Sequence, residues 1–373
     1  MTIKRLAPLT DPNERLIIKN LLFIFFTGLP IIMFTAISGT LTDTNVHNPF
    51  LNEIEAIVHL FVIVPFLLFA ERLVELPLVD YLERTTELIL KSDRSKLIKF
   101  KKRFLSLIKS SVPELIILGV LYLLTIFRIT NVEFEMSSWL FQNESTDNEY
   151  HLSLAGLWFN FVSIPLYQFL FIRWFWRWLL WLGSVIYISR LKWRIHAMHG
   201  DKMAGLEYLN YLPFVFGVCA TSIAANLSVE IFVEIREGLK TLFDFKFIVA
   251  GFVLITTITC YLPLVFFLPK LSQLRSEAII KFGTLIQYHH NFFEKKWFSK
   301  PETEVEDILG STHPSSLGDI NASYEAVQAM LAIPVNYKYM MISAFILTIP
   351  FLPLLSTLYS GKELFDMLIK TMF

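Results

Sequence analysis

The sequence predicts an all-α protein, a polytopic transmembrane helical bundle of about seven spans with its N-terminus in the cytoplasm. Two observations lead to this prediction. Of the 373 residues, 54% are hydrophobic and 18% are charged, and the mean hydropathy of +0.53 is high for a soluble domain. The apolar residues also gather in runs of about 20, the length that crosses a hydrocarbon core as a helix.

Six apolar runs qualify as spans, and they cover residues 17–38, 56–79, 112–129, 211–229, 247–268 and 339–358. A seventh run, residues 154–189, is too long for one perpendicular crossing at about 1.5 Å per residue. We interpret it as a single tilted or kinked span, bent near Pro165. A span that includes a re-entrant piece is the alternative. The second and sixth runs share a weak similarity, which we do not take as evidence of a duplication.

The distribution of basic residues predicts the orientation, because cytoplasmic loops carry an excess of lysine and arginine. None lies between Lys19 and Arg72 or between Arg128 and Arg173. In contrast, residues 80–111 hold nine, residues 190–210 hold four and residues 269–338 hold seven. These three segments and the N-terminus are therefore predicted to be cytoplasmic. The chain has 33 basic and 33 acidic residues, so no overall field favours nucleic acid, and we expect none as a partner.

Two cytoplasmic segments have a character of their own. Residues 80–111 form a basic amphipathic loop with apolar residues at helical spacing, which suits contact with anionic membrane lipids. Lys101, Lys102 and Arg103 are the candidates for headgroup or anion binding. The alternative is ordinary loop charge packed on the ends of other helices. Residues 269–338 form the largest cytoplasmic loop, with helices expected over residues 271–293 and 320–331.

Ionisable residues within spans are costly, so they mark either a polar cavity or an interface with headgroups. Arg173 and Arg177 lie four residues apart and share a helix face, as do Glu71 and Glu75. Glu114 is at the inner end of the third span. The functional hypothesis is a polar vestibule that faces the cytoplasm and is lined by these five residues. The alternative is that the arginines extend to headgroups beside a belt of tryptophans.

The loop after the fourth span contains a polar turn, His-Ala-Met-His-Gly-Asp-Lys-Met-Ala-Gly-Leu, at residues 196–206. His196, His199 and Asp201 are weak candidates for a metal site, because their side chains suit a metal but their spacing matches no known template. His199 and Lys202 are candidates for binding an anion or a lipid headgroup. The third reading, which we favour, is a structural elbow. No cofactor is expected.

Several segments have a distinctive sequence: HLFVIVPFLLFAERL, IPLYQFLFIRWFWRWLLW, and GDINASYEAV followed by FLPLL. Through these segments the chain resembles, over most of its length, a group of uncharacterised bacterial multi-pass membrane proteins. HGDKMAGLEYL is also similar to that group's His-Pro-Asp-x-Ala-Gly-Gly-Leu turn, with Gly200 in place of the proline and Ala204 in place of the first paired glycine. No activity is assigned to the group, so the resemblance implies a bacterial inner (plasma) membrane and nothing further.

Two classes of function remain open. The first is a transporter or channel with a polar vestibule that faces the cytoplasm. The second is a non-catalytic scaffold, sensor or accessory protein that binds lipid or a partner through its cytoplasmic loops. An intramembrane enzyme is less favoured, because the chain has no Gly-x-Ser-x-Gly elbow, no His-Glu-x-x-His and no aspartate pair within a span. The sequence does not indicate the oligomeric state.

Overall fold

The computed structural model describes residues 12–42, 49–131, 139–143, 150–238, 240–298 and 312–358. These residues are almost entirely helical, which confirms the all-α class. Five helical stretches are long and apolar enough to cross a membrane: Lys91–Thr130, Leu154–Ser189, Glu207–Arg236, Leu242–Trp297 and Tyr337–Thr357. Shorter apolar helices lie at Leu22–Ile37 and Ile54–Ala70. The count of seven spans and the side of the N-terminus stay predictions.

Large apolar side chains cover the outside of these helices. Leu123 is 69% exposed and Leu254 is 61% exposed, and both have apolar neighbours on the same surface. A soluble protein avoids apolar surface of this extent, whereas lipid tails are its natural surroundings. The exposed surface therefore agrees with a membrane protein.

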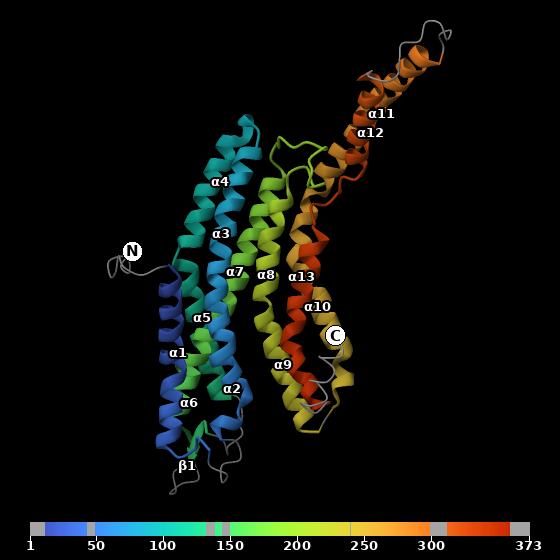
Figure 1. Cartoon of the computed structure of the whole chain (residues 1–373). Helices are drawn as coiled ribbons and strands as arrows, with labels where there is room; N and C mark the ends of the chain where they lie inside the picture. The colour runs from blue at the N-terminus through green and yellow to red at the C-terminus, as the bar shows by residue number, and fades with distance from the viewer. Residues whose placement is uncertain are drawn as a thin grey trace.

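The first half of the chain forms one group of helices (Figure 1). Helix α1 (Pro12–Ile37) is followed by the short turn η1 (Phe50–Asn52), α2 (Ile54–Val58) and α3 (Val64–Leu88). Helix α4 (Lys91–Lys109) returns along α3 and leads into α5 (Val112–Asn131). Strands β1 (Phe141–Asn143) and β2 (Tyr150–Leu152) form an antiparallel pair before α6 (Leu154–Trp158) and α7 (Ile164–Ser189).

The second half forms a second group beside the first (Figure 1). It contains η4 (Glu207–Asn210), α8 (Tyr211–Cys219), α9 (Thr221–Arg236), η5 (Leu242–Phe245), α10 (Lys246–Tyr261) and η6 (Leu262–Phe267). Helices α11 (Leu268–Trp297) and α12 (Thr312–Gln328) pack as a hairpin that projects from the bundle, and α13 (Tyr337–Thr348) with η8 (Ile349–Thr357) returns into it. Helix α12 begins eight residues before the expected start, with Pro314 in its first turn, where a missing N–H is tolerated.

Two spans contain the same irregularity. A π-helical turn, η2 (His59–Ile63), precedes Pro65, and another, η3 (Phe159–Ser163), precedes Pro165. A proline ring clashes with the carbonyl group four residues earlier, and the wider π turn makes room for it. Residues 154–189 are thus one continuous helical stretch with an irregular turn just before Pro165. The helical stretches that begin at Ile54 and Leu154 are alike in this respect, a repetition that the sequence analysis did not identify.

The buried core is shared at one end of the molecule and divided at the other. At the end that carries α4, Tyr81, Trp181 and Phe267 belong to one cluster that joins both groups of helices. At the opposite end one cluster surrounds Trp139 and a separate one surrounds Phe351. An opening is therefore left between the two groups at that end.

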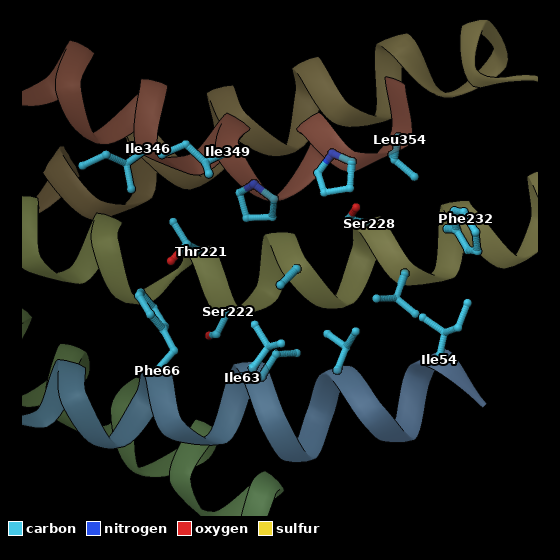
Figure 2. A pocket seen from close by; sticks show the side chains of 16 residues that line it. Ile54, Ile63, Phe66, Thr221, Ser222, Ser228, Phe232, Ile346, Ile349 and Leu354 are labelled. Carbon is cyan, nitrogen blue, oxygen red and sulfur yellow. The ribbon is translucent and has the colours of Figure 1, made fainter. Parts of the chain in front are cut away.

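This opening is an apolar crevice of about 580 Å³ (Figure 2). Helix α9 forms its floor, and its walls come from α2–α3 on one side and α13–η8 on the other. The Ser222 hydroxyl donates to the carbonyl oxygen of Cys219 at 2.8 Å, across the junction of α9 and α8. The Thr221 hydroxyl is likewise bonded to the Val218 carbonyl oxygen. Because these two hydroxyls are bonded to the backbone and most other lining side chains are apolar, the crevice is suited to apolar groups.

Candidate functional site

The polar turn of the loop after α7 is organised by one carboxylate. Asp201 Oδ1 accepts the backbone N–H groups of Met203 at 2.8 Å and Gly205 at 3.1 Å, and Oδ2 accepts that of Glu207 at 3.1 Å. Nδ1 of His199 lies 2.8 Å from Oδ1. The Asp201 side chain is only 7% exposed, so these contacts take the place of water.

The backbone of this turn has the curvature that brings three N–H groups to one carboxylate. Lys202, Ala204 and Gly205 have left-handed φ angles of 59°, 58° and 89°. This conformation costs a residue with a side chain about 1–2 kcal/mol, and bonds to Asp201 offset that cost. Burial alone would raise the pKa of Asp201, but the three backbone N–H groups and His199 outweigh it and hold the pKa below its ordinary value.

The turn therefore has the features of a structural elbow. Within the described ranges, no group of three or more His, Cys, Asp or Glu side chains is placed to hold a metal ion. His196 is exposed and has no part in the Asp201 contacts described above, and Lys202 is exposed on the outside of the turn. The metal and anion roles considered for these residues thus gain no support from their geometry.

Asn210 ties the elbow to the segment before α13. Its Nδ2 donates to the carbonyl oxygens of Glu207 and Pro334, both at 3.0 Å, and its Oδ1 accepts the N–H of Asn336 at 2.8 Å. Asn336 Nδ2 in turn donates to Glu207 Oε1 at 2.9 Å. The backbone N–H of Leu331 also donates to the Lys202 carbonyl oxygen, so two segments far apart in sequence form one unit.

A polar cavity of about 400 Å³ lies between this unit and the end of α3. We call it the tyrosine pocket, and its lining consists of Arg84, Glu87, Leu88, His199, Asp201, Gly205, Glu207, Tyr208, Tyr211 and Tyr339. Three stretches of the chain contribute to it: the last turns of α3, residues 199–211, and the first turn of α13.

The charges in the tyrosine pocket do not balance. Arg84 Nε lies 2.7 Å from Asp80 Oδ1, outside the lining, and the Arg84 guanidinium stands 5.9 Å from the centre of the Tyr208 ring. Asp201 is bonded to three backbone N–H groups and lies beside His199, as described above. Glu87 and Glu207 remain as two carboxylates beyond these pairs, and the bond from the Asn336 amide does not neutralise Glu207. The pocket therefore carries an excess of negative charge.

The tyrosine rings give the pocket aromatic walls. The Tyr208 hydroxyl is 2.9 Å from the Thr85 hydroxyl, and a tyrosine phenol is neutral at neutral pH. The rings of Tyr211 and Tyr339 are 5.5 Å apart at 51°, and their hydroxyl oxygens are 3.5 Å apart. Neutral aromatic faces beside carboxylates form a suitable environment for an organic cation.

Of the five residues predicted to form a vestibule, the structure brings Arg173 and Glu114 into contact. Arg173 Nε lies 3.1 Å from Glu114 Oε1, with side chains 24% and 34% exposed, so α7 and α5 share an ion pair. The Arg177 guanidinium lies 5.8 Å from the centre of the Trp174 ring. Glu71 and Glu75 belong to α3, but their side chains lie outside the described part of the structure. Arg173, Arg177 and Glu114 line none of the five principal cavities of the described ranges.

The basic loop forms an upright helix, α4, whose apolar face is packed on the bundle. Leu97 and Phe104 are buried in the shared core, and Lys102 and Arg103 project around a surface hollow. Lys101 is outside that hollow.

A polar cluster within the spans escaped the sequence analysis. His59, on the first π turn, has its Nε2 bonded to Asn226 Oδ1, and its ring stacks on Tyr167 at 4.7 Å. Asn226 Nδ2 donates to Glu230 Oε1 at 3.1 Å. A histidine inside an apolar run was the available signal. No linear signal could have identified the tyrosine pocket, because its members come from distant segments.

Comparison with known proteins does not identify a relative. No protein-family model, curated protein or solved structure matches this chain. The resemblance to a group of bacterial membrane proteins therefore stays a prediction, and function has to be argued from the site itself.

Proposed function

We propose that this protein is a seven-span membrane protein of a bacterial inner membrane that binds a small organic cation in the tyrosine pocket. The observation that carries this proposal is the convergence of three tyrosine rings with the surplus carboxylates of Glu87 and Glu207. Ammonium groups are attracted both to aromatic faces and to carboxylates, whereas the same surplus charge repels phosphates and acids.

The positions of the basic segments support the proposed topology. Helix α4, the elbow and the α11–α12 hairpin all lie at one end of the bundle, and β1 lies at the other (Figure 1). These are the three segments rich in lysine and arginine, and such segments are retained in the cytoplasm. On this topology the tyrosine pocket faces the cytoplasm, as does the N-terminus.

Titration of the protein in nanodiscs of neutral lipid, with calorimetry as the readout, tests the binding proposal. Two probes are used, tetramethylammonium and the diamine putrescine, with acetate as the anionic comparison. At least one cation should bind saturably and acetate should not. Failure of both cations to bind, or equal binding of acetate, would overturn the proposal.

Variants connect the binding to the pocket. Glu87→Gln removes an exposed carboxylate of the lining and should weaken cation binding about five-fold, equivalent to about 1 kcal/mol. Tyr211→Leu should weaken it by a similar factor. Glu83→Gln is the matched control, because Glu83 lies one turn away on α3, outside the lining, and carries the same charge. An equal loss in all three variants would indicate long-range attraction only.

Transport of the cation is the second candidate function. It is favoured by the positions of the tyrosine pocket and the apolar crevice. The tyrosine pocket and the apolar crevice are both bordered by α3 and lie towards opposite ends of the spans. Between them is a packed layer that includes Leu67, Val74 and Phe216. Gly217 contacts Ser343 so closely that a Cβ would lie 2.9 Å from the serine Cβ. Helices broken by prolines are also common where transporters bend.

Flux in proteoliposomes distinguishes transport from binding alone. Radiolabelled forms of whichever cation binds should exchange across the membrane if the packed layer opens. Binding without exchange would exclude the transport candidate and leave the binding proposal intact.

A further inference from the structure

Helix α4 is an unusual concentration of positive charge. Its 19 residues include eight lysines and arginines and a single acidic residue, Asp93. Beside it lies a surface hollow of about 480 Å³, here called the basic hollow, which is lined by Lys96, Lys99, Phe100, Lys102, Arg103 and Tyr187. The hollow is separate from the tyrosine pocket and shares no lining residue with it.

The basic hollow has a fixed floor. The rings of Phe100 and Tyr187 are stacked, with centroids 4.3 Å apart and an interplanar angle of 11°. Leu97 and Phe104 on the same helix are 1% and 3% exposed, so the backbone of α4 is held against the bundle. The lysine and arginine side chains of the lining extend from this supported helix, and they share the hollow with the two stacked rings.

The start of α4 is also anchored. Asp93 Oδ1 lies 2.9 Å from Lys96 Nζ, and Asp93 Oδ2 accepts the backbone N–H of Lys192 at 3.0 Å. The one acidic side chain of α4 is therefore committed to Lys96. Lys99, Lys102 and Arg103 form the part of the lining that no acid of α4 balances.

The height of the basic hollow argues against a lipid as its ligand. On the proposed topology, helix α5 enters the membrane at about Val112, its first residue, and α4 stands beside α3 at the cytoplasmic end (Figure 1). At about 1.5 Å per residue, Arg103 lies about 13 Å and Lys96 about 24 Å beyond that point. The headgroup layer accounts for only about 5–8 Å on each side of a bilayer. Surface charge is screened over a further distance of about 8 Å. Lys96 and Lys99, at about 24 Å and 20 Å, lie beyond both distances, whereas Arg103 lies near their outer limit.

We propose that the basic hollow binds a soluble phosphorylated small molecule with at least two neighbouring phosphate charges. Its volume of about 480 Å³ lies in the range of roughly 300–1,000 Å³ that is usual for small-ligand sites. Lysine and arginine are the residues that bind phosphate oxygens through charge-assisted hydrogen bonds. A single phosphate carries only about 1.5–2 negative charges, so it would leave at least one of Lys99, Lys102 and Arg103 unmatched.

Inorganic pyrophosphate is the probe, titrated into the full-length protein in phosphatidylcholine nanodiscs, which have no net charge. Saturable binding is expected. The double variant Lys99→Gln/Arg103→Gln should weaken binding by at least about ten-fold, because two charge-assisted contacts are lost. The matched control is Arg94→Gln/Lys101→Gln, which removes the same charge from α4 outside the hollow and should change the affinity less than about two-fold. Thermal unfolding of both variants checks that α4 remains packed.

Three results would overturn the proposal. The first is no binding of pyrophosphate by the parent protein. The second is an equal loss of affinity in the two double variants, which would mean that α4 attracts anions without a site. The third is binding of lipid alone. In that case Lys99→Gln/Arg103→Gln would weaken the binding of phosphatidylglycerol vesicles, and pyrophosphate would not bind. None of these results depends on the cation proposal, because the two sites share no residue.

Discussion

Replacing Asp201 by asparagine should destabilise the elbow without changing its size. An amide keeps one acceptor oxygen but turns its nitrogen towards a backbone N–H, so one of the three accepted bonds is lost. The lost bond costs about 1 kcal/mol, and the buried N–H left without an acceptor costs about 1–2 kcal/mol more. We therefore expect Asp201→Asn to lower the free energy of unfolding by about 2–3 kcal/mol.

The same substitution should change the response to acid. The pKa of Asp201 is lower in the folded protein than its ordinary value, despite burial, because of the backbone N–H groups and His199. The carboxylate therefore stabilises the fold above the unfolded pKa of about 3.9, and this contribution is lost as the pH falls through the folded pKa. The difference in stability between the parent protein and Asp201→Asn should shrink as the pH falls below about 4.

Hydrogen exchange in nanodiscs gives the most direct readout. At least one of the amides of Met203, Gly205 and Glu207 should lose protection in Asp201→Asn, and thermal unfolding should begin at a lower temperature. Asp244→Asn is the control, because Asp244 accepts the N–H of Thr241 at 2.8 Å in a different turn. Unchanged exchange at all three amides, or a stability difference that does not vary with pH, would refute the reasoning.

Three further experiments test the packing. A Cβ on Gly156 would clash with the backbone carbonyl oxygen of Leu140, so Gly156→Ala should cost about 3 kcal/mol or more and lower the melting temperature. Gly183→Ala, with open space around it, should not. Asn210→Ala removes three hydrogen bonds and should cost about 2–4 kcal/mol, and an unchanged melting temperature would contradict this. A double-mutant cycle on Arg173 and Glu114 should give a coupling free energy of about 0.2–1 kcal/mol, because both side chains are partly exposed. A coupling above about 3 kcal/mol would mean that lipid excludes water from this ion pair.

Much of the helical framework followed from the sequence alone. Each of the seven apolar runs lies in a helical segment of the structure, and residues 154–189 form one continuous stretch. The polar turn at residues 196–206 was also recognised, and its interpretation as an elbow agrees with the bonds of Asp201. These features are local, because a run of about 20 apolar residues must bond its own backbone and a turn is defined by its neighbours.

Only the tertiary structure decided which polar residues meet. Arg173 and Glu114 were both expected near the cytoplasmic ends of their spans, but the ion pair between them depends on how α5 packs on α7. The tyrosine pocket joins Arg84 and Tyr339 to the elbow across long stretches of chain, and the basic hollow depends on Tyr187 of α7 lying beside α4. The hydrophobic length of a span is a property of one segment. A binding site depends on helix packing, which is set by side-chain contacts between segments that the linear order does not reveal.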